Sequence, residues 1–207
     1  MCQGKKSNII LVRHGESKAN VESRNNPNVW FDLENQLTGS GREQIKKIGG
    51  ILKEMNVNEI YCSNTIRARD SAKIIAKEIG QKIKEEVEGL IEQVISSEKL
   101  NEEQLEELIN CWKQGKDFKF KGGETVCEFK DRILKELEKH YSSNKTIVIV
   151  THAGVISVVC AYFSGQDFIK ARTLSKDINY GEGRVLEFKD SKLWSLHKLP
   201  KDNNFYL

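Results

Sequence analysis

The amino-acid sequence predicts an α/β protein, a three-layer α/β/α sandwich with a mostly parallel central sheet. Two uninterrupted apolar runs, at 9–12 and 147–150, are typical of strands that are buried on both faces. Between them, segments with apolar residues at helical spacing alternate with further strand candidates, the pattern of a parallel sheet covered by helices. No repeat or linker interrupts the 207 residues, so we expect a single domain over 1–207.

The first half of the chain contains three expected strands and two expected helices. After the strand at 9–12, the polar residues 18–35 are expected to form a loop, with a turn signal at 25–28. Ser40 and Glu43 have the spacing of a capping box ahead of apolar residues at helical spacing, which indicates the start of a helix. The next expected elements are a strand at 59–63, a helix that begins at 64–65 and ends at Gly80, and a short strand at 81–87.

The second half begins with a helical pattern over 97–115. Asn101 and Gln104 have the spacing of a capping box at its start. The remaining expected elements are a helix over about 126–137, a strand at 146–150, a helix that ends near 163, edge strands near 178–180, 184–188 and 193–196, and a loosely held tail at 198–207.

Composition excludes several classes of function. There are 33 Lys and Arg against 30 Asp and Glu, and no basic stripe interleaved with aromatic residues, so we expect no nucleic-acid partner. The first residues lack the apolar core of a signal peptide and no apolar run is long enough to span a bilayer, so we expect a cytoplasmic protein with no membrane partner. The five scattered cysteines favour free thiols. No ligand cluster for zinc or magnesium is visible, so we expect neither metal nor cofactor.

Charged and imidazole side chains follow the expected strands. The first buried strand ends on Arg13 and His14, the second ends on His152, and the strand between them ends shortly before Arg67. Because the carboxyl ends of parallel strands meet at one edge, where ligands bind, we expect these side chains to converge there. Guanidinium groups bind phosphate oxygens in bidentate fashion, so the sequence predicts a phosphoryl site. We expect Gly15 to let the ligand approach the backbone without a Cβ in the way.

These residues resemble a known family. Arg13-His14-Gly15-Glu16 is similar to the signature of the histidine phosphatase superfamily, which includes cofactor-dependent phosphoglycerate mutases and many phosphatases. The resemblance covers about residues 8–188. Further blocks that match in the family's order are Asn20, Leu37-Thr38-x-x-Gly41, Cys62-Ser63-Asn64-Thr65-Ile66-Arg67-Ala68, Leu90-Ile91-Glu92, Gly123-Glu124-Thr125 and Thr151-His152-Ala153-Gly154.

The resemblance implies a two-step phosphoryl transfer through a phosphohistidine. His14 would attack phosphorus, and for this its imidazole must be neutral. The flanking Arg13 and Arg67 disfavour the protonated imidazole, and a backbone carbonyl that accepts from the other ring nitrogen would fix the tautomer. The two arginines and His152 would neutralise charge on the transferring oxygens.

The resemblance also implies a general acid and further contacts with the substrate. Glu92 would protonate the leaving alkoxide and then act as base on the incoming water. Glu88 stays open as an alternative, because acidic residues are common in this part of the chain. Asn20 and Ala153 would join Arg13, Arg67 and His152 in substrate binding.

Three functions fit these residues. The leading one is a metal-independent phosphomonoesterase that acts on a small phosphorylated metabolite. Ala153-Gly154 after the second histidine is similar to phosphatase members, and the lid-like helical insertion at about 94–123 is shorter than a mutase's. The alternatives are a cofactor-dependent phosphoglycerate mutase and an inactive phosphate-binding or scaffolding protein. The sequence leaves the substrate and the oligomeric state open.

Overall fold

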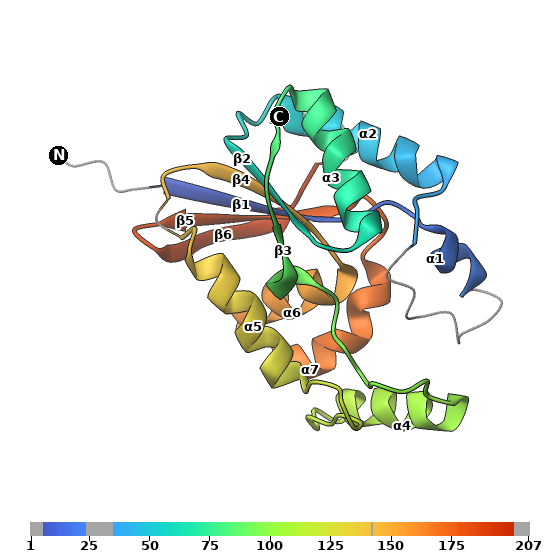
Figure 1. Cartoon of the computed structure of the whole chain (residues 1–207). Coiled ribbons are helices and arrows are strands. Elements are labelled where there is room, and N and C mark those ends of the chain that lie inside the picture. Colours follow the sequence, from blue (N-terminus) through green and yellow to red (C-terminus); the bar gives the residue numbers. More distant parts are fainter. Residues whose placement is uncertain (1–5, 24–34, 142, 201–207) are drawn as a thin grey trace.

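The computed structural model describes residues 6–23, 35–141 and 143–200, and its centre is one six-stranded sheet. The strands are β1 (Lys6–Arg13), β2 (Glu59–Ser63), β3 (Ile83–Val87), β4 (Thr146–Thr151), β5 (Gly183–Lys189) and β6 (Lys192–Lys198). They lie in the order β3-β2-β4-β1-β5-β6 (Figure 1). Strands β3, β2, β4 and β1 are parallel to one another. Strand β5 is antiparallel to β1, and β6 is antiparallel to β5.

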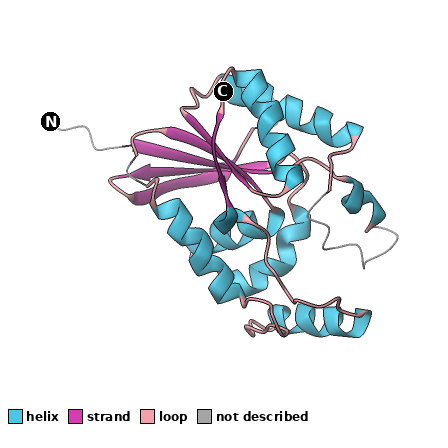
Figure 2. Ribbon diagram, viewed as in Figure 1, coloured by secondary structure: helices cyan, strands magenta, loops and turns pink. Residues whose placement is uncertain are grey.

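Helices cover both faces of the sheet (Figures 1 and 2). One face carries α2 (Gly39–Lys53) and α3 (Ile66–Ile79), and the other carries α5 (Val126–Glu138), α6 (Ala153–Phe163) and α7 (Phe168–Ala171). The remaining helical elements are α1 (Lys18–Glu22), η2 (Glu88–Leu90), α4 (Glu102–Lys113) and η3 (Arg172–Asp177). The predicted fold class, a mixed α/β sandwich with a mostly parallel sheet, is therefore confirmed.

Strand β1 shows why the chain folds in three layers. Its four central residues are fully buried. Ile9 and Leu11 belong to the core under α5 and α6, whereas Ile10 and Val12 belong to the core under α2 and α3. Since successive side chains of a strand point to opposite faces, an uninterrupted apolar run supplies both cores at once.

Several predicted boundaries are confirmed. The Asn101 side chain accepts a hydrogen bond from the backbone N–H of Gln104 at 2.8 Å and caps α4. Gly80 ends α3 in the left-handed conformation, with φ of 70°. The four described cysteines are free. No helix in the described part of the chain has the length and apolarity needed to cross a bilayer.

Other boundaries were wrong. Helix α2 is capped by Thr38, whose side chain accepts from the Gly41 N–H, and not by the expected Ser40–Glu43 box. The polar segment expected to be a loop opens with the helix α1. The segment 97–115 is helical only over α4, and 178–180 forms no strand because η3 runs up to it. The expected turn at 25–28 and most of the expected tail lie outside the described residues.

Candidate active site

The carboxyl ends of β1, β4 and β2 form one edge of the sheet. Arg13 pairs with Thr151 in the β1–β4 register, and the backbone N–H of His14 continues the ladder by donating to the Thr151 carbonyl at 2.9 Å. His14 and His152 are therefore neighbours, with ring centroids 5.2 Å apart in an edge-on arrangement. The convergence expected from the strand endings is present in the structure.

Gly15 holds the turn after β1 against the helix layer. A Cβ at this position would overlap the backbone of Gly41 in the first turn of α2. The Gly15 N–H also donates to the Ser71 hydroxyl of α3 at 3.1 Å. The expectation that this glycine leaves room for a ligand was wrong, because protein atoms fill that space.

The partners of His14 define its tautomer. Its Nδ1 lies 2.8 Å from the Gly15 carbonyl oxygen, which can only accept, and its Nε2 lies 3.2 Å from the Nε of Arg67, which can only donate. Nδ1 therefore carries the proton and Nε2 carries the free electron pair. Burial, and then the charges of His152, Arg67 and Arg13, lower the pKa of His14 well below its ordinary value. The side chain is thus a neutral imidazole with its reactive nitrogen beside a guanidinium group.

His152 is held from both sides. Its Nε2 lies 2.9 Å from the hydroxyl of Ser63, the last residue of β2, and its Nδ1 lies 3.5 Å from Nη2 of Arg67. Burial, and then the positive charges of Arg67 and Arg13, lower the pKa of this imidazole well below its ordinary value as well. Arg67 therefore bridges the two histidines.

Arg13 lies on the other side of His14. Its guanidinium carbon is 3.8 Å from the ring centroid of Tyr180, and the group donates to the carbonyl oxygen of Ile178. Its buried Nε has no hydrogen-bond partner among the described residues. The segment that we expected to be an edge strand thus folds over the site as a loop and positions an arginine. An arginine held in this way still has a donor to offer an anion.

Glu92 contacts the first turn of α6, directly after His152. One carboxylate oxygen, Oε2, accepts from the backbone N–H of Gly154 at 2.9 Å, and Oε1 accepts from the N–H of Gln93 at 2.9 Å. The guanidinium group of Arg172 lies 3.3 Å from Oε1. Burial acts to raise the pKa of Glu92, but Arg172 and the two N–H groups outweigh it, so the pKa lies below its ordinary value.

The remaining predicted residues have different positions. Glu88 is exposed on η2, whereas the Glu92 carboxylate reaches the first turn of α6 directly after His152, so the geometry favours Glu92. The side-chain oxygen of Asn20 accepts from the N–H and hydroxyl of Ser17 and caps α1. Ala153 is the buried first residue of α6.

Sequence reasoning missed two residues of this site. Arg172 lies in η3, a segment without a recognisable pattern, and Tyr180 was expected in an edge strand. Neither has a signal in the local sequence, because each acts through a contact with a residue far away in the chain. Among the described residues, no group of three or more His, Cys, Asp or Glu could hold a metal ion.

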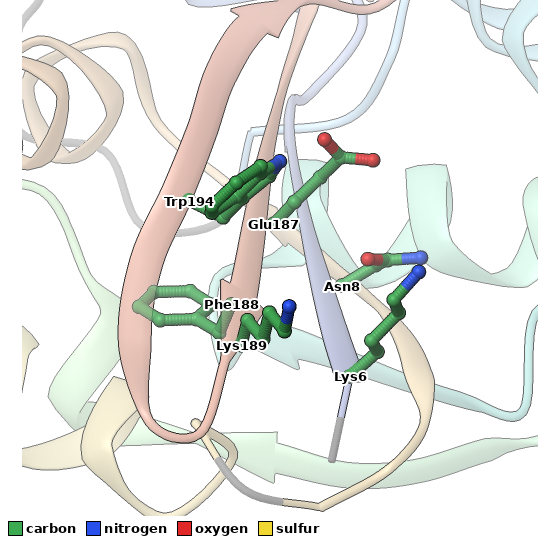
Figure 3. Close-up of a pocket in the computed structure, with 6 residues that line it drawn as sticks. All are labelled: Lys6, Asn8, Glu187, Phe188, Lys189 and Trp194. Carbon is green, nitrogen blue, oxygen red and sulfur yellow. The ribbon is translucent and has the colours of Figure 1, made fainter. Parts of the chain in front are cut away.

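A hollow lies away from this edge (Figure 3). It has a volume of about 200 Å³, and it includes Lys6 at the amino end of β1, the end opposite His14, and the exposed ring of Trp194. None of the predicted site residues lines it.

Comparison with known proteins agrees with this geometry. A sequence model of the histidine phosphatase superfamily (branch 1) matches residues 9–200. The chain is 30% identical to phosphoglycerate mutase-like protein 4 of Arabidopsis thaliana over 162 residues, which are 72% of this chain and 67% of that protein. The chain spans 67% of the length of that relative and 59% of the length of the probable phosphoglycerate mutase GpmB of Salmonella choleraesuis, to which it is 28% identical over 133 residues.

Two solved structures have the same fold. The phosphoglycerate mutase of Bacillus anthracis aligns with a TM-score of 0.72 at 16% identity, over 97% of this chain and 95% of that one. A mycobacterial glucosyl-3-phosphoglycerate phosphatase in complex with VO3 aligns with a TM-score of 0.71 at 18% identity, over 92% of this chain and 96% of that one. At these identities the likeness concerns the fold.

Proposed function

Since the chain belongs to the histidine phosphatase superfamily (branch 1), whose members are phosphatases or mutases, we propose that it hydrolyses phosphomonoesters of small metabolites through a phosphohistidine on His14. One observation carries this proposal. The Nε2 lone pair of His14 faces the guanidinium group of Arg67, while Nδ1 is held by the Gly15 carbonyl. A neutral imidazole with a fixed tautomer, next to a group that binds phosphate, is prepared for attack on phosphorus.

In the first step, Nε2 of His14 attacks phosphorus and the bond between phosphorus and the alcohol oxygen breaks. Glu92 donates a proton to the departing oxygen, and the alcohol leaves. Arg13 and Arg67 stabilise the charge on the three equatorial oxygens, and His152 joins them once the bound phosphoryl anion favours its protonated form. In the second step, water attacks phosphorus, Glu92 takes its proton, the P–N bond breaks and neutral His14 is restored. No metal or cofactor takes part in this proposal.

A mutase is the second candidate, because relatives named phosphoglycerate mutase-like match the chain. One feature supports hydrolysis instead. The segment between Glu92 and α5 contains no arginine, so it offers no bidentate clamp for a second anionic group of a bisphosphate. Incubation with 3-phosphoglycerate and catalytic bisphosphoglycerate separates the two: isomer without free phosphate would overturn hydrolysis.

The test of the main proposal is hydrolysis of p-nitrophenyl phosphate with and without EDTA, together with acid-labile and base-stable labelling of the protein by a radioactive phosphomonoester. We expect hydrolysis that survives EDTA and label that disappears in His14→Ala. His197→Ala is the matched control, because His197 is exposed on β6. Full activity of His14→Ala would refute the mechanism, and an inert wild-type protein would favour the phosphate-binding or scaffolding alternative.

A further inference from the structure

We propose that Arg172 is the positioning residue for the general acid: it holds Glu92 so that one lone-pair site of its Oε2 is left for the proton that passes to the leaving alcohol. This inference rests on the proposed function and deepens it. Arg172 touches neither histidine in any contact that the structure describes, and its polar contacts are with Glu92, Gln93 and Ser175.

The carboxylate of Glu92, like any carboxylate, has about four lone-pair sites, two on each oxygen. On Oε1, the N–H of Gln93 and the guanidinium of Arg172 occupy both. On Oε2, the N–H of Gly154 is the single donor among the described residues. The remaining site is therefore on Oε2, the oxygen bonded to the turn that follows His152.

Arg172 itself is buried, with an exposed fraction of only 7%. Its Nε donates to the side-chain oxygen of Gln93 at 2.8 Å, and Nη1 donates to the Ser175 hydroxyl at 2.9 Å. The ring of Trp112 in α4 lies 5.1 Å from its guanidinium carbon, and that of Phe129 in α5 lies 6.0 Å away. These contacts fix the buried guanidinium group on several sides, independently of Glu92. The position of Arg172 therefore determines the position of the Glu92 carboxylate.

Close packing against Gly154 also holds the Arg172–Glu92 pair in place. A Cβ on Gly154 would overlap Oε1 of Glu92 and would come within 2.9 Å of the guanidinium carbon of Arg172. The Arg172–Glu92 pair is thus packed against the backbone of the first turn of α6, two residues from His152. The absence of a side chain at 154 makes room for the pair, and not for the substrate.

The pair also has a consequence for pH dependence. The charged groups that face Glu92 are Arg172, Arg67 and Arg13. Arg172 lowers the pKa of Glu92, and a general acid must be protonated in the first step, so kcat/KM falls as the pH rises through that pKa. Removing the charge of Arg172 raises the pKa and moves this fall to higher pH.

The experiment compares phenyl phosphate with p-nitrophenyl phosphate. The two esters are nearly the same in shape, but phenolate needs a proton to leave far more than nitrophenolate does. Arg172→Lys keeps the charge and loses the planar fork. In this variant we expect kcat/KM to fall by at least about tenfold more for phenyl phosphate than for p-nitrophenyl phosphate. The reason is that general acid catalysis contributes about 10²–10⁴-fold. Arg172→Gln should in addition shift the fall of kcat/KM to higher pH.

Gly154→Ala provides a second variant that does not remove a buried charge. Alanine favours a helix over glycine, so α6 should persist, while the carboxylate of Glu92 is pushed aside. We expect the same selective loss with phenyl phosphate. Arg69→Lys is the matched control, because Arg69 pairs with Glu86 on the surface of the protein.

Equal losses with both esters in folded Arg172→Lys and Gly154→Ala, or no loss, would overturn the positioning role while leaving the proposed function intact. Wild-type protein that hydrolyses neither ester would instead overturn the proposed function, and this inference with it.

Discussion

The Nε of Arg67 lies 3.2 Å from Nε2 of His14, and the same guanidinium group reaches Nδ1 of His152 at 3.5 Å. One arginine thus holds Nε2 of His14, the proposed nucleophile, and the facing nitrogen of the second histidine. We expect an arriving phosphoryl group to insert among these three side chains and take over their hydrogen bonds. The site is therefore arranged around Arg67 before any substrate binds.

The first prediction follows from this bridge. Lysine has no planar fork, so Arg67→Lys would leave one of the two histidines without its partner. A hydrogen bond to a charged group contributes about 1.5–3 kcal/mol, which corresponds to a loss of about 10- to 150-fold in kcat/KM for p-nitrophenyl phosphate. Steady-state kinetics would measure it. A loss no larger than that of Arg69→Lys, on the surface of the same helix, would show that the bridge has no catalytic role.

The second prediction concerns stability and pH. His14 and His152 have pKa values well below the ordinary value in the folded protein, while in the unfolded chain they titrate near about pH 6.5. As the pH falls below about 6.5, the unfolded chain binds protons that the folded protein does not, so the free energy of unfolding decreases by up to about 1.4 kcal/mol per pH unit for each histidine.

Urea unfolding between about pH 7.5 and about pH 5 would measure this slope. Carboxylates with a lowered pKa do not interfere, because Glu59, whose pKa lies at about 2, loses its contribution only at lower pH. His14→Gln should flatten the slope, and inorganic phosphate should flatten it in the wild-type protein, since an anion favours the protonated imidazoles. An unchanged slope in His14→Gln would contradict the assignment of a neutral buried imidazole.

The sequence predicted the site residues that a buried strand positions, and it missed those that contacts between distant segments position. Arg13, His14 and His152 were predicted because each follows a buried strand, and the topology of a parallel sheet brings such endings together. Arg172 and Tyr180 were not, because no local pattern indicates a contact between segments about 80 or more residues apart. The role of Gly15 was misread for the same reason: its neighbour, Gly41, lies in helix α2, in a different part of the chain.

The third prediction concerns Ser63, whose buried hydroxyl lies 2.9 Å from Nε2 of His152. Arg67 can only donate to Nδ1 of this neutral imidazole, so Nε2 carries the proton and donates to Ser63. Ser63→Ala leaves a buried donor without a partner, which costs about 1–3 kcal/mol. We expect a lower midpoint of thermal unfolding and a lower kcat, with Ser164→Ala as control, because Ser164 is exposed at the end of α6. A normal kcat would mean that the orientation of His152 does not depend on Ser63.

The last prediction separates the ring of Tyr180 from its hydroxyl. The guanidinium carbon of Arg13 lies over the ring, 3.8 Å from its centroid, and the ring centroid is 6.2 Å from that of His14. A cation–π contact of this kind contributes about 0.5–2 kcal/mol. Tyr180→Phe keeps the ring, so KM for p-nitrophenyl phosphate should stay close to that of the wild-type protein. Tyr180→Ala releases Arg13. We expect KM to rise by about 2- to 30-fold, which is the free energy of the cation–π contact converted to a ratio of KM values. If Tyr180→Phe raised KM as much as Tyr180→Ala, the hydroxyl of Tyr180 and not its ring would be the group that positions Arg13.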